Sequence, residues 1–219
     1  MLLTRSEFEG RKAKGTLRIA LIGMSNIGKS HWTRDIVKRH DFKSYEVDEA
    51  IQKRLDVENI EQSAARMGQP YDKDYQNRAQ EYLALEQEMT LDAENVPGNI
   101  ILDTTGSVIY LPILTTNIIK NSYLTVYISA NQKQIGTLIQ RFTTTQKPLI
   151  WGEAYEQKSG LSRHESMMAC YPFLLESRAT LYKSMTDITV EAAGCALGNK
   201  DGFLGLIKTA LPIAANRHP

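Results

Sequence analysis

A short segment near the start of the chain, LIGMSNIGKSHW at residues 21–32, combines the residue types that bind phosphate. The pattern G-x-x-x-x-G-K-[ST] of a phosphate-binding loop is matched by Gly23, Gly28, Lys29 and Ser30. Glycines let consecutive backbone N–H groups turn inward around an anion, and a following helix adds its positive end. We expect Lys29 to reach the β- and γ-phosphates and the Ser30 hydroxyl to bind Mg²⁺. The alternative is an ordinary glycine turn between a strand and a helix.

Acidic residues follow two other apolar runs. Glu46 and Asp48 end the run FKSYEVD, where an extended chain would direct both carboxylates to one side. Asp103 follows NIIL and precedes TTGS. Because carboxylates beside a phosphate loop commonly hold its cation, Glu46 and Asp103 join Ser30 as candidate Mg²⁺ ligands. The alternative is that Asp48 and Asp103 cap the helices that follow them.

Strands and helices alternate along the chain, which predicts an α/β fold with a parallel sheet covered on both faces. Strands are expected at 16–23, 99–106, 123–130 and 187–192, with a short strand running into a helix over 42–50. Helices are expected at 28–40, over most of 59–95 with a break at 68–70, at 108–120, at 131–142, in a segment ending near Tyr182, and near 201–211. Ligands of such folds bind beyond the carboxyl ends of the strands, where the loop and the acidic residues would lie.

The composition of the chain excludes several classes of protein. Its 219 residues are enough for one substantial core, and 26 basic against 25 acidic residues give no basic field for nucleic acid. Cys170 and Cys195 lack metal-ligand spacing, as do His31, His40, His164 and His218. Because two isolated cysteines suggest no disulfide framework, a reducing cytoplasm is the expected location, and no apolar run approaches a membrane span.

Residues 1–15 form a segment without the apolar core of a signal peptide, and we expect a loose or peripheral tail. Residues 16–219 are then expected to form one domain. The polar segment at about 141–165, and in particular RFTTTQKPLIWGEAYEQKSG at 141–160, is expected to be a mobile lid, because its Thr, Gln and Gly content offers little apolar area to bury.

Six motifs follow one another along the chain: GMSNIGKS, EVDEAI, RAQE at 78–81, DTTGSV at 103–108, KPLI at 147–150 and RATLY at 178–182. Their order, over roughly residues 17–210, resembles that of the shikimate kinases. The resemblance implies a three-layer α/β/α P-loop kinase fold, with a central parallel sheet of about five strands, helices on both faces and a mobile lid. It also implies a monomer that uses ATP and Mg²⁺.

The resemblance further implies roles for individual residues. Asp48 would bind the substrate hydroxyls and orient the acceptor, Arg78 and Arg178 would bind a substrate carboxylate, and Gly106 would face the substrate. Lys147, in the lid, would reach the transferring phosphates and act in catalysis with Lys29 and Asp48. The nucleotide-binding set would comprise Gly23, Asn26, Ile27, Gly28, Lys29, Ser30, His31, Arg141 and Lys147.

Three positions depart from the family pattern. Glu46 replaces the first aspartate of the acidic pair, which lengthens the side chain by a methylene. Thr105-Gly106-Ser107 replaces a triple glycine, so side chains are expected to intrude where backbone lies against the substrate. Lys147 replaces the usual lid arginine, so a point charge stands where a bidentate fork is usual.

The sequence therefore predicts an ATP-dependent kinase of a small anionic hydroxylated acid, with shikimate as the first candidate and neither nucleic acid nor membrane as a partner. A gluconate-kinase-like or nucleotide-kinase-like phosphotransferase keeps the fold and changes the acceptor. A nucleotide-binding protein with degenerate kinase activity is the third interpretation, and the altered TTGS segment favours it.

Overall fold

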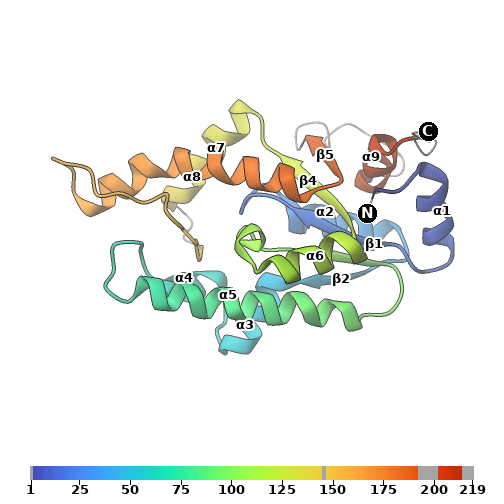
Figure 1. The fold of residues 1–219 in the computed structure, drawn as a ribbon, viewed down its shortest axis with the longest axis horizontal. Helices are drawn as coiled ribbons and strands as arrows, with labels where there is room; N and C mark the ends of the chain where they lie inside the picture. The colour runs from blue at the N-terminus through green and yellow to red at the C-terminus, as the bar shows by residue number, and fades with distance from the viewer. Residues whose placement is uncertain (1, 145–146, 192–201, 214–219) are drawn as a thin grey trace.

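A parallel five-stranded sheet forms the centre of the protein (Figure 1). The computed structural model describes residues 2–144, 147–191 and 202–213. The strand order is β2-β3-β1-β4-β5, and every neighbouring pair is parallel. The strands are β1 Arg18–Ile22, β2 Lys43–Glu46, β3 Ile100–Asp103, β4 Leu124–Ser129 and β5 Ile188–Glu191. The predicted sheet of about five parallel strands is confirmed.

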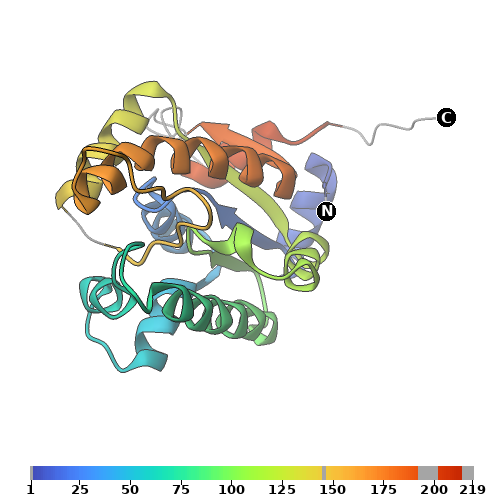
Figure 2. The ribbon, with the colours of Figure 1, turned by 60° about the vertical axis from the view of Figure 1, so that its left-hand side comes forward.

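Helices cover both faces of the sheet (Figure 2). Helix α2 lies in the connection from β1 to β2, which runs towards the β2 edge of the sheet. Helices α6 and α8 lie in the connections from β3 to β4 and from β4 to β5, which run towards the β5 edge. Because such crossovers are right-handed, α2 lies on one face and α6 and α8 on the other, and α9 packs beside α2. The helices are α1 Arg5–Ala13, α2 Lys29–Arg39, α3 Val47–Leu55, α4 Ile60–Met67, α5 Tyr75–Asp92, α6 Ile113–Ser122, α7 Gln132–Thr144, α8 Arg163–Met185 and α9 Gly202–Ala210.

The sheet centre is apolar and brings the polar residues of interest to one edge. Strands β1 and β3 are almost wholly buried, which agrees with their continuous apolar sequences. Gly23 follows β1, while Glu46 and Asp103 end β2 and β3 and are direct partners in the strand register. The carboxyl ends of three adjacent strands therefore meet beside the phosphate-loop sequence.

Helices α3, α4 and α5 form a separate group beside β2 (Figure 1). The long helical stretch expected at 59–95 is interrupted at residues 68–74, a longer break than the expected 68–70. Gly68 ends α4 with a φ of 75°, a left-handed value that favours glycine. Helix α5 is the long helix that runs from this group back towards β3.

Two expectations about local structure are wrong. The N-terminal segment is not a loose tail, because α1 begins with a capping box at Thr4 and buries Phe8. The helix expected at 108–120 is divided: a 3-10 turn, Val108–Tyr110, precedes α6, and Pro112 separates them because proline lacks an N–H for a continuous helix.

Several expected features reach beyond the described residues. These are the last residue of the strand expected at 187–192, the first residue of the helix expected near 201–211, Cys195 and His218. Among the residues described, no helix combines the length and the hydrophobicity needed to cross a membrane. Cys170 is a buried free thiol.

Candidate functional site

The phosphate-loop sequence forms a loop between β1 and α2. Asn26 and Gly28 have φ values of 65° and 110°, and a Cβ at Gly23 would lie 2.9 Å from the Ile128 carbonyl oxygen. The positive φ values turn the backbone so that N–H groups face inward. No side chain caps the N-terminus of α2 at Gly28, which leaves the first N–H groups of the helix available to an anion.

Lys29 is buried at the base of this loop. Its Nζ donates to the carbonyl oxygens of Gly23 at 3.0 Å and Met24 at 3.2 Å. Burial lowers the pKa of Lys29, and the nearby carboxylates of Asp103 and Asp48 oppose that effect. The ammonium is thus held beside two carboxylates, in a position to bind phosphate oxygens.

A cavity of about 380 Å³ opens on the loop, and we call it the P-loop cavity. Its lining includes most of the residues expected to act on nucleotide or metal: Asn26, Gly28, Lys29, Ser30, His31, Glu46, Asp48, Asp103, Arg141 and Lys147. Gly23 and Ile27 are not among the lining residues. Gly23 instead packs against Ile128, and Ile27 belongs to the hydrophobic core.

Ser30, Glu46 and Asp103 have the chemistry of a Mg²⁺ site. Burial raises the pKa of Asp103, and Lys29 and the Ser30 hydroxyl partly offset the rise. Burial also raises the pKa of Glu46, with further contributions from Glu49 and Asp103, while Arg34 and a hydrogen bond from Ser30 lower it. Burial and neighbouring carboxylates thus raise the pKa of both groups, and a bound cation would oppose both effects.

A second observation, on Asp103, also suits a divalent cation at these three residues. Asp103 Oδ2 is buried and has no hydrogen-bond partner among the described residues. The described part of the chain holds no cluster of three or more His, Cys, Asp or Glu side chains suited to a metal. Mg²⁺ commonly takes only one or two carboxylates and fills its shell with phosphate oxygens and water, so this donor set suits it.

Asp48 lies in the first turn of α3 and not on an extended chain, which corrects the expected geometry of the acidic pair. The strand ends at Glu46, and the two carboxylates nevertheless line the same P-loop cavity. Asp48 Oδ1 accepts a hydrogen bond from the Tyr82 hydroxyl at 3.3 Å. Burial raises the pKa of Tyr82 well above its ordinary value, so the tyrosine remains a donor to Asp48.

A second cavity, which we call the inner cavity, measures only about 10 Å³. It shares Ser25, Asp48, Ile60 and Lys147 with the P-loop cavity. The full lining is Ser25, Asp48, Ile60, Tyr82, Thr105, Gly106, Ser107, Lys147, Pro148 and Arg178. A six-membered ring does not fit this volume, so an acceptor requires part of the wall to move.

Arg178 is buried at one side of the inner cavity. Its Nη1 donates to the Gly106 carbonyl oxygen at 3.2 Å, and its Nη2 donates to the Ile150 carbonyl oxygen at 2.6 Å. Its Nε has no partner among the described residues. The guanidinium is thus near the expected substrate site, with two of its nitrogens bonded to main-chain oxygens.

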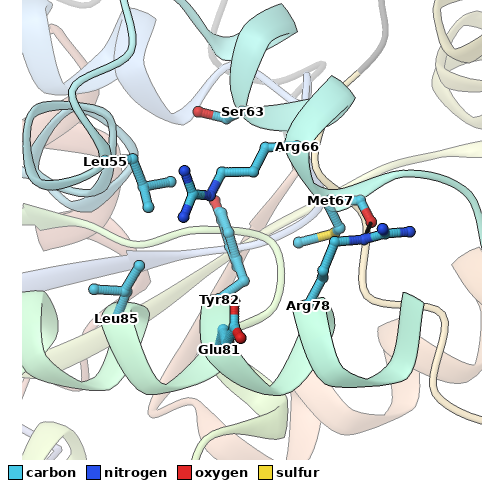
Figure 3. A pocket seen from close by; sticks show the side chains of 8 residues that line it. All are labelled: Leu55, Ser63, Arg66, Met67, Arg78, Glu81, Tyr82 and Leu85. Carbon is cyan, nitrogen blue, oxygen red and sulfur yellow. Dashed lines mark hydrogen bonds between the residues drawn. The ribbon is translucent and has the colours of Figure 1, made fainter. Parts of the chain in front are cut away.

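Arg78 is separated from Arg178 and lines a third cavity of about 260 Å³ between α3, α4 and α5, the helical cavity. Figure 3 shows Arg78 turned towards the Met67 carbonyl oxygen, which its Nε contacts at 2.8 Å. Its Nη2 lies 3.6 Å from Asp72, so its ion-pair partner is neither Glu81 nor Asp74, the acidic residues nearest to it in the sequence. The structure does not bring the two arginines together, although Tyr82 borders both the helical and the inner cavity.

The segment expected to be a polar lid buries more apolar area than its composition suggests. Ile150, Trp151 and Ala154 are buried, which contradicts the expectation of little apolar area. The Tyr75 hydroxyl donates to the Leu149 carbonyl oxygen at 2.7 Å and accepts from the Trp151 N–H at 2.8 Å. The segment around Trp151 is therefore anchored in the core.

The first part of the expected lid lies at the P-loop cavity. Arg141, near the end of α7, donates to the Asn26 carbonyl oxygen at 3.1 Å and so contacts the phosphate loop directly. Lys147 lines both the P-loop and the inner cavity. Residues 145 and 146, between them, lie outside the described residues.

Sequence reasoning missed Glu86, which is fully buried on α5. Its Oε1 accepts from the Thr105 hydroxyl and its Oε2 from the Ser107 hydroxyl, the latter at 2.5 Å. The hydroxyls of the altered TTGS segment are therefore bonded to Glu86, and do not simply intrude on the substrate. The sequence did hold one signal for a buried Glu86, because this carboxylate lies on the same face of the helix as Ala79, Tyr82 and Met89.

Comparisons with known proteins show the fold of the chain but do not identify its acceptor substrate. No family model and no curated protein sequence matches the chain. Shikimate kinase from Bacteroides thetaiotaomicron is similar in structure, with a TM-score of 0.59, 16% identity, and coverage of 88% of this chain and 95% of that one.

Two further solved structures agree with this result. Shikimate kinase from Acinetobacter baumannii, in complex with shikimate, has a TM-score of 0.56 and 16% identity, with coverage of 87% of this chain and 89% of that one. Shikimate kinase from Aquifex aeolicus has a TM-score of 0.52 and 22% identity, with coverage of 88% and 92%. The chain has a shikimate-kinase-like P-loop kinase fold.

Proposed function

We propose that this chain is an ATP-dependent phosphotransferase that acts on a hydroxyl of a small hydroxylated carboxylic acid. The observation that carries the proposal is the meeting of Lys29, Asp48 and Asp103 at one cavity in a fold shared with shikimate kinases. Phosphoryl transfer needs positive charge on the phosphates, a carboxylate towards the acceptor and a carboxylate towards the cation. Shikimate is the first acceptor to test.

Nucleotide would bind with its phosphates in the P-loop cavity. The N–H groups at the start of α2 and the Lys29 ammonium supply the positive partners for phosphate oxygens. Ser30, Glu46 and Asp103 would hold Mg²⁺. When bound, the cation neutralises charge on the β- and γ-phosphates.

In the proposed transfer, the acceptor oxygen forms a bond to the γ-phosphorus while the bond from that phosphorus to the β–γ bridging oxygen breaks, which releases ADP. The proton of the acceptor hydroxyl passes to Asp48, whose Oδ1 already accepts from Tyr82. Lys29 and Lys147 stabilise the charge on the transferring group. Positioning and electrostatics supply most of such catalysis.

The acceptor would occupy an enlarged inner cavity, with Gly106 at its wall. Arg178 would bind the acceptor carboxylate through Nη2, released from the Ile150 carbonyl oxygen, and through Nε, which has no partner among the described residues. A planar guanidinium forms charge-assisted bonds to carboxylates, which are stronger than bonds to neutral carbonyl groups. Movement of the segment from Lys147 to Ile150 would both open the cavity and free Arg178.

The position of Arg78 favours a second candidate function. Arg78 is bonded to Met67 and Asp72 and lines the helical cavity, so a two-arginine carboxylate clamp requires it to leave both partners. A gluconate-kinase-like or nucleotide-kinase-like enzyme keeps the nucleotide site and changes the acceptor. The small inner cavity is the feature that favours a nucleotide-binding protein with degenerate activity.

One experiment separates these functions. The protein is incubated with Mg·ATP and, in separate reactions, with shikimate, gluconate, a nucleoside monophosphate or no acceptor, and ADP release and the phosphorylated product are followed by ³¹P NMR. We expect an acceptor-dependent product with a hydroxylated acid, and its loss in Asp48→Asn. Binding of ATP without transfer to any acceptor would favour the degenerate protein, and failure to bind ATP would overturn the proposal.

A further inference from the structure

Helix α5 connects to two parts of the inner cavity through side chains one turn apart. Tyr82 donates to Asp48 of α3, and Glu86 is bonded to the segment Thr105–Ser107 that follows β3. Residues four apart lie on the same face of a helix, so one face of α5 contacts both. The helix therefore links the proposed proton acceptor to the wall of the acceptor site.

Glu86 is held by neutral partners only. Each carboxylate oxygen accepts one hydroxyl, from Thr105 and from Ser107, and the Ser107 N–H donates to Thr105 Oγ1 at 3.1 Å. The charged groups that face it are Asp48 and Arg178. Burial raises the pKa of Glu86 to about 7, the two hydroxyl bonds lower it, Asp48 raises it and Arg178 lowers it. A carboxylate buried without a direct cation is expensive, which argues against a purely stabilising role.

Gly106 is fixed between these two hydroxyl-bearing residues. Its carbonyl oxygen accepts from Arg178 Nη1 at 3.2 Å and from the Tyr182 hydroxyl at 2.5 Å. A Cβ at this position would come within 2.7 Å of Ser25 Oγ in the phosphate loop. The Gly106 peptide is thus held by α8 on its carbonyl and by α5 through its neighbours, with no room for a side chain.

We propose that Glu86 is the positioning residue of the acceptor site, which holds the Gly106 peptide in place opposite Asp48 and Arg178 by accepting hydrogen bonds from Thr105 and Ser107. The inference rests on the proposed function for its kinetic consequences. Glu86 contacts Thr105 and Ser107, which line the inner cavity and not the P-loop cavity, so its removal should impair acceptor use and leave nucleotide binding unchanged. The Thr105-Gly106-Ser107 sequence and Glu86 then form one functional unit.

The kinetic test compares Glu86→Leu and Glu86→Gln with the wild type on the best acceptor. Leucine removes both hydrogen bonds, and we expect kcat/KM for the acceptor to fall at least tenfold while the Kd of ATP stays within twofold. Glutamine keeps the shape, and hydroxyls can donate or accept, so we expect most of kcat/KM to return. Because the amide does not titrate, the part of any change in the acceptor KM between pH 6 and 8 that comes from Glu86 should be absent in Glu86→Gln.

Glu88 provides the matched control on the same helix. It forms an exposed ion pair with Arg54 at 3.5 Å, away from both cavities, so Glu88→Leu and Glu88→Gln should behave as the wild type. Wild-type kcat/KM per folded molecule in Glu86→Leu would overturn the proposal, because the glutamate would then be structural only.

A second readout needs no acceptor and so remains decisive if the proposed function fails. In ligand-free protein we expect the Gly106 amide resonance to titrate with a midpoint near pH 7. The titration should be absent in Glu86→Gln and present in Asp48→Asn, which separates Glu86 from its charged neighbour. A resonance that does not titrate in the wild type, or that titrates equally in Glu86→Gln, would refute the coupling of Glu86 to Gly106.

Discussion

Lys29 shows how a single side chain is prepared for phosphate. Without an anion its ammonium is bonded to two carbonyl oxygens of its own loop, so it is already immobile and dehydrated where a phosphate would bind. Exchange of neutral carbonyl groups for phosphate oxygens gives stronger, charge-assisted bonds. Loss of this charge should therefore affect the transition state more than the fold.

We predict that Lys29→Ala lowers kcat for phosphotransfer on the order of 10²- to 10³-fold, as expected when one preorganised donor to developing charge is removed. Steady-state kinetics under saturating Mg·ATP test this, with circular dichroism as the check on folding. Lys38, exposed on the same helix, is the control, and Lys38→Ala should retain full turnover. Unchanged turnover in Lys29→Ala would refute the phosphate-loop assignment.

A second prediction about single residues concerns Arg178 and Arg78. Arg178→Met should weaken acceptor binding by roughly 2–4 kcal/mol, because one partner of a desolvated charge pair is lost. Calorimetric titration of acceptor and ATP measures this, and the affinity for ATP should stay unchanged.

The double variant with Arg78→Met distinguishes a shared clamp from separate sites. If both arginines bind one carboxylate, the two losses add to less than their sum. If Arg78 only lines the helical cavity, Arg78→Met leaves acceptor affinity unchanged. The second result would assign the acceptor carboxylate to Arg178 alone.

Glu86 should make the free energy of unfolding decrease as pH rises, whereas carboxylates with a lowered pKa make it increase. Its pKa is about 7 in the folded protein against 4.5 ordinarily, so the folded state retains a proton that the unfolded state releases. Its contribution to the free energy of unfolding is fully present below pH 4.5. This contribution falls by roughly 3 kcal/mol in total as pH rises to about 7.

Urea denaturation of the wild type and Glu86→Gln, from pH 4.5 to 8, measures this contribution. The difference in free energy of unfolding between the two proteins should change by that amount, since all other groups cancel. Parallel curves would show that Glu86 does not titrate in this range.

At the scale of elements, the segment after α7 has two parts of different stability. Trp151 is buried and its N–H donates to Tyr75, whereas Lys147 lies at the cavity surface. We predict slow amide exchange at Trp151 in free protein, and fast exchange at Lys147 and Leu149 that slows when nucleotide and acceptor bind. Equal protection at Lys147 and Leu149 in both states would remove a moving lid from the mechanism.

The anchor itself is tested by substitution. Trp151→Ala should lower the free energy of unfolding by about 3–5 kcal/mol, as for other large buried aromatics. Phe173→Ala, at an exposed position on α8, is the control and should change it by less than about 0.5 kcal/mol. Chemical denaturation measures both.

The elements of the sheet were predictable because their sequences are locally unambiguous. NIIL ends in three consecutive apolar residues, YLTVYIS is rich in β-branched and aromatic residues, and each forms a buried parallel strand, as does the run before Gly23. Boundaries depended on single residues such as Pro112, which divides an otherwise helical run. The lid was misjudged because composition does not report that the Trp151 ring packs against Phe142 and Tyr171 or that its backbone N–H donates to Tyr75.

The candidate site was predictable where a motif carries its own geometry. The phosphate loop brings its backbone N–H groups, Lys29 and Ser30 together locally, and strand register adds Glu46 and Asp103. The contacts of Arg78 and Glu86 depend on how α5 lies against α3, α4 and the end of β3. Sequence spacing alone does not determine such helix packing, so these contacts were not predicted.

At the scale of the whole molecule, α1 and α9 pack together although they are distant in the sequence (Figure 1). The Arg5 guanidinium donates to the Thr209 and Leu211 carbonyl oxygens, and Glu9 pairs with Lys208 at 2.5 Å. Phe8, on the same helix, belongs to the hydrophobic core, with 1% of its surface exposed.

We predict that Phe8→Ala lowers the free energy of unfolding by about 3–5 kcal/mol. Glu9→Ala, which breaks only the surface ion pair, should lower it by less than about 1 kcal/mol. Thermal and urea unfolding of both variants test this difference, and a Phe8→Ala loss no larger than that of Glu9→Ala would show that α1 is not part of the core.

The placement of Glu46 on the outermost strand has a consequence for cooperativity. Strand β2 is four residues long, pairs only with β3 at one edge of the sheet and has exposed or half-buried side chains, so it should open more readily than the central strands. Glu46 and Asp103 would hold the cation from two neighbouring strands, one at the edge and one nearer the centre. Ligand binding at the phosphate loop should therefore also protect the amides of β2 from hydrogen exchange.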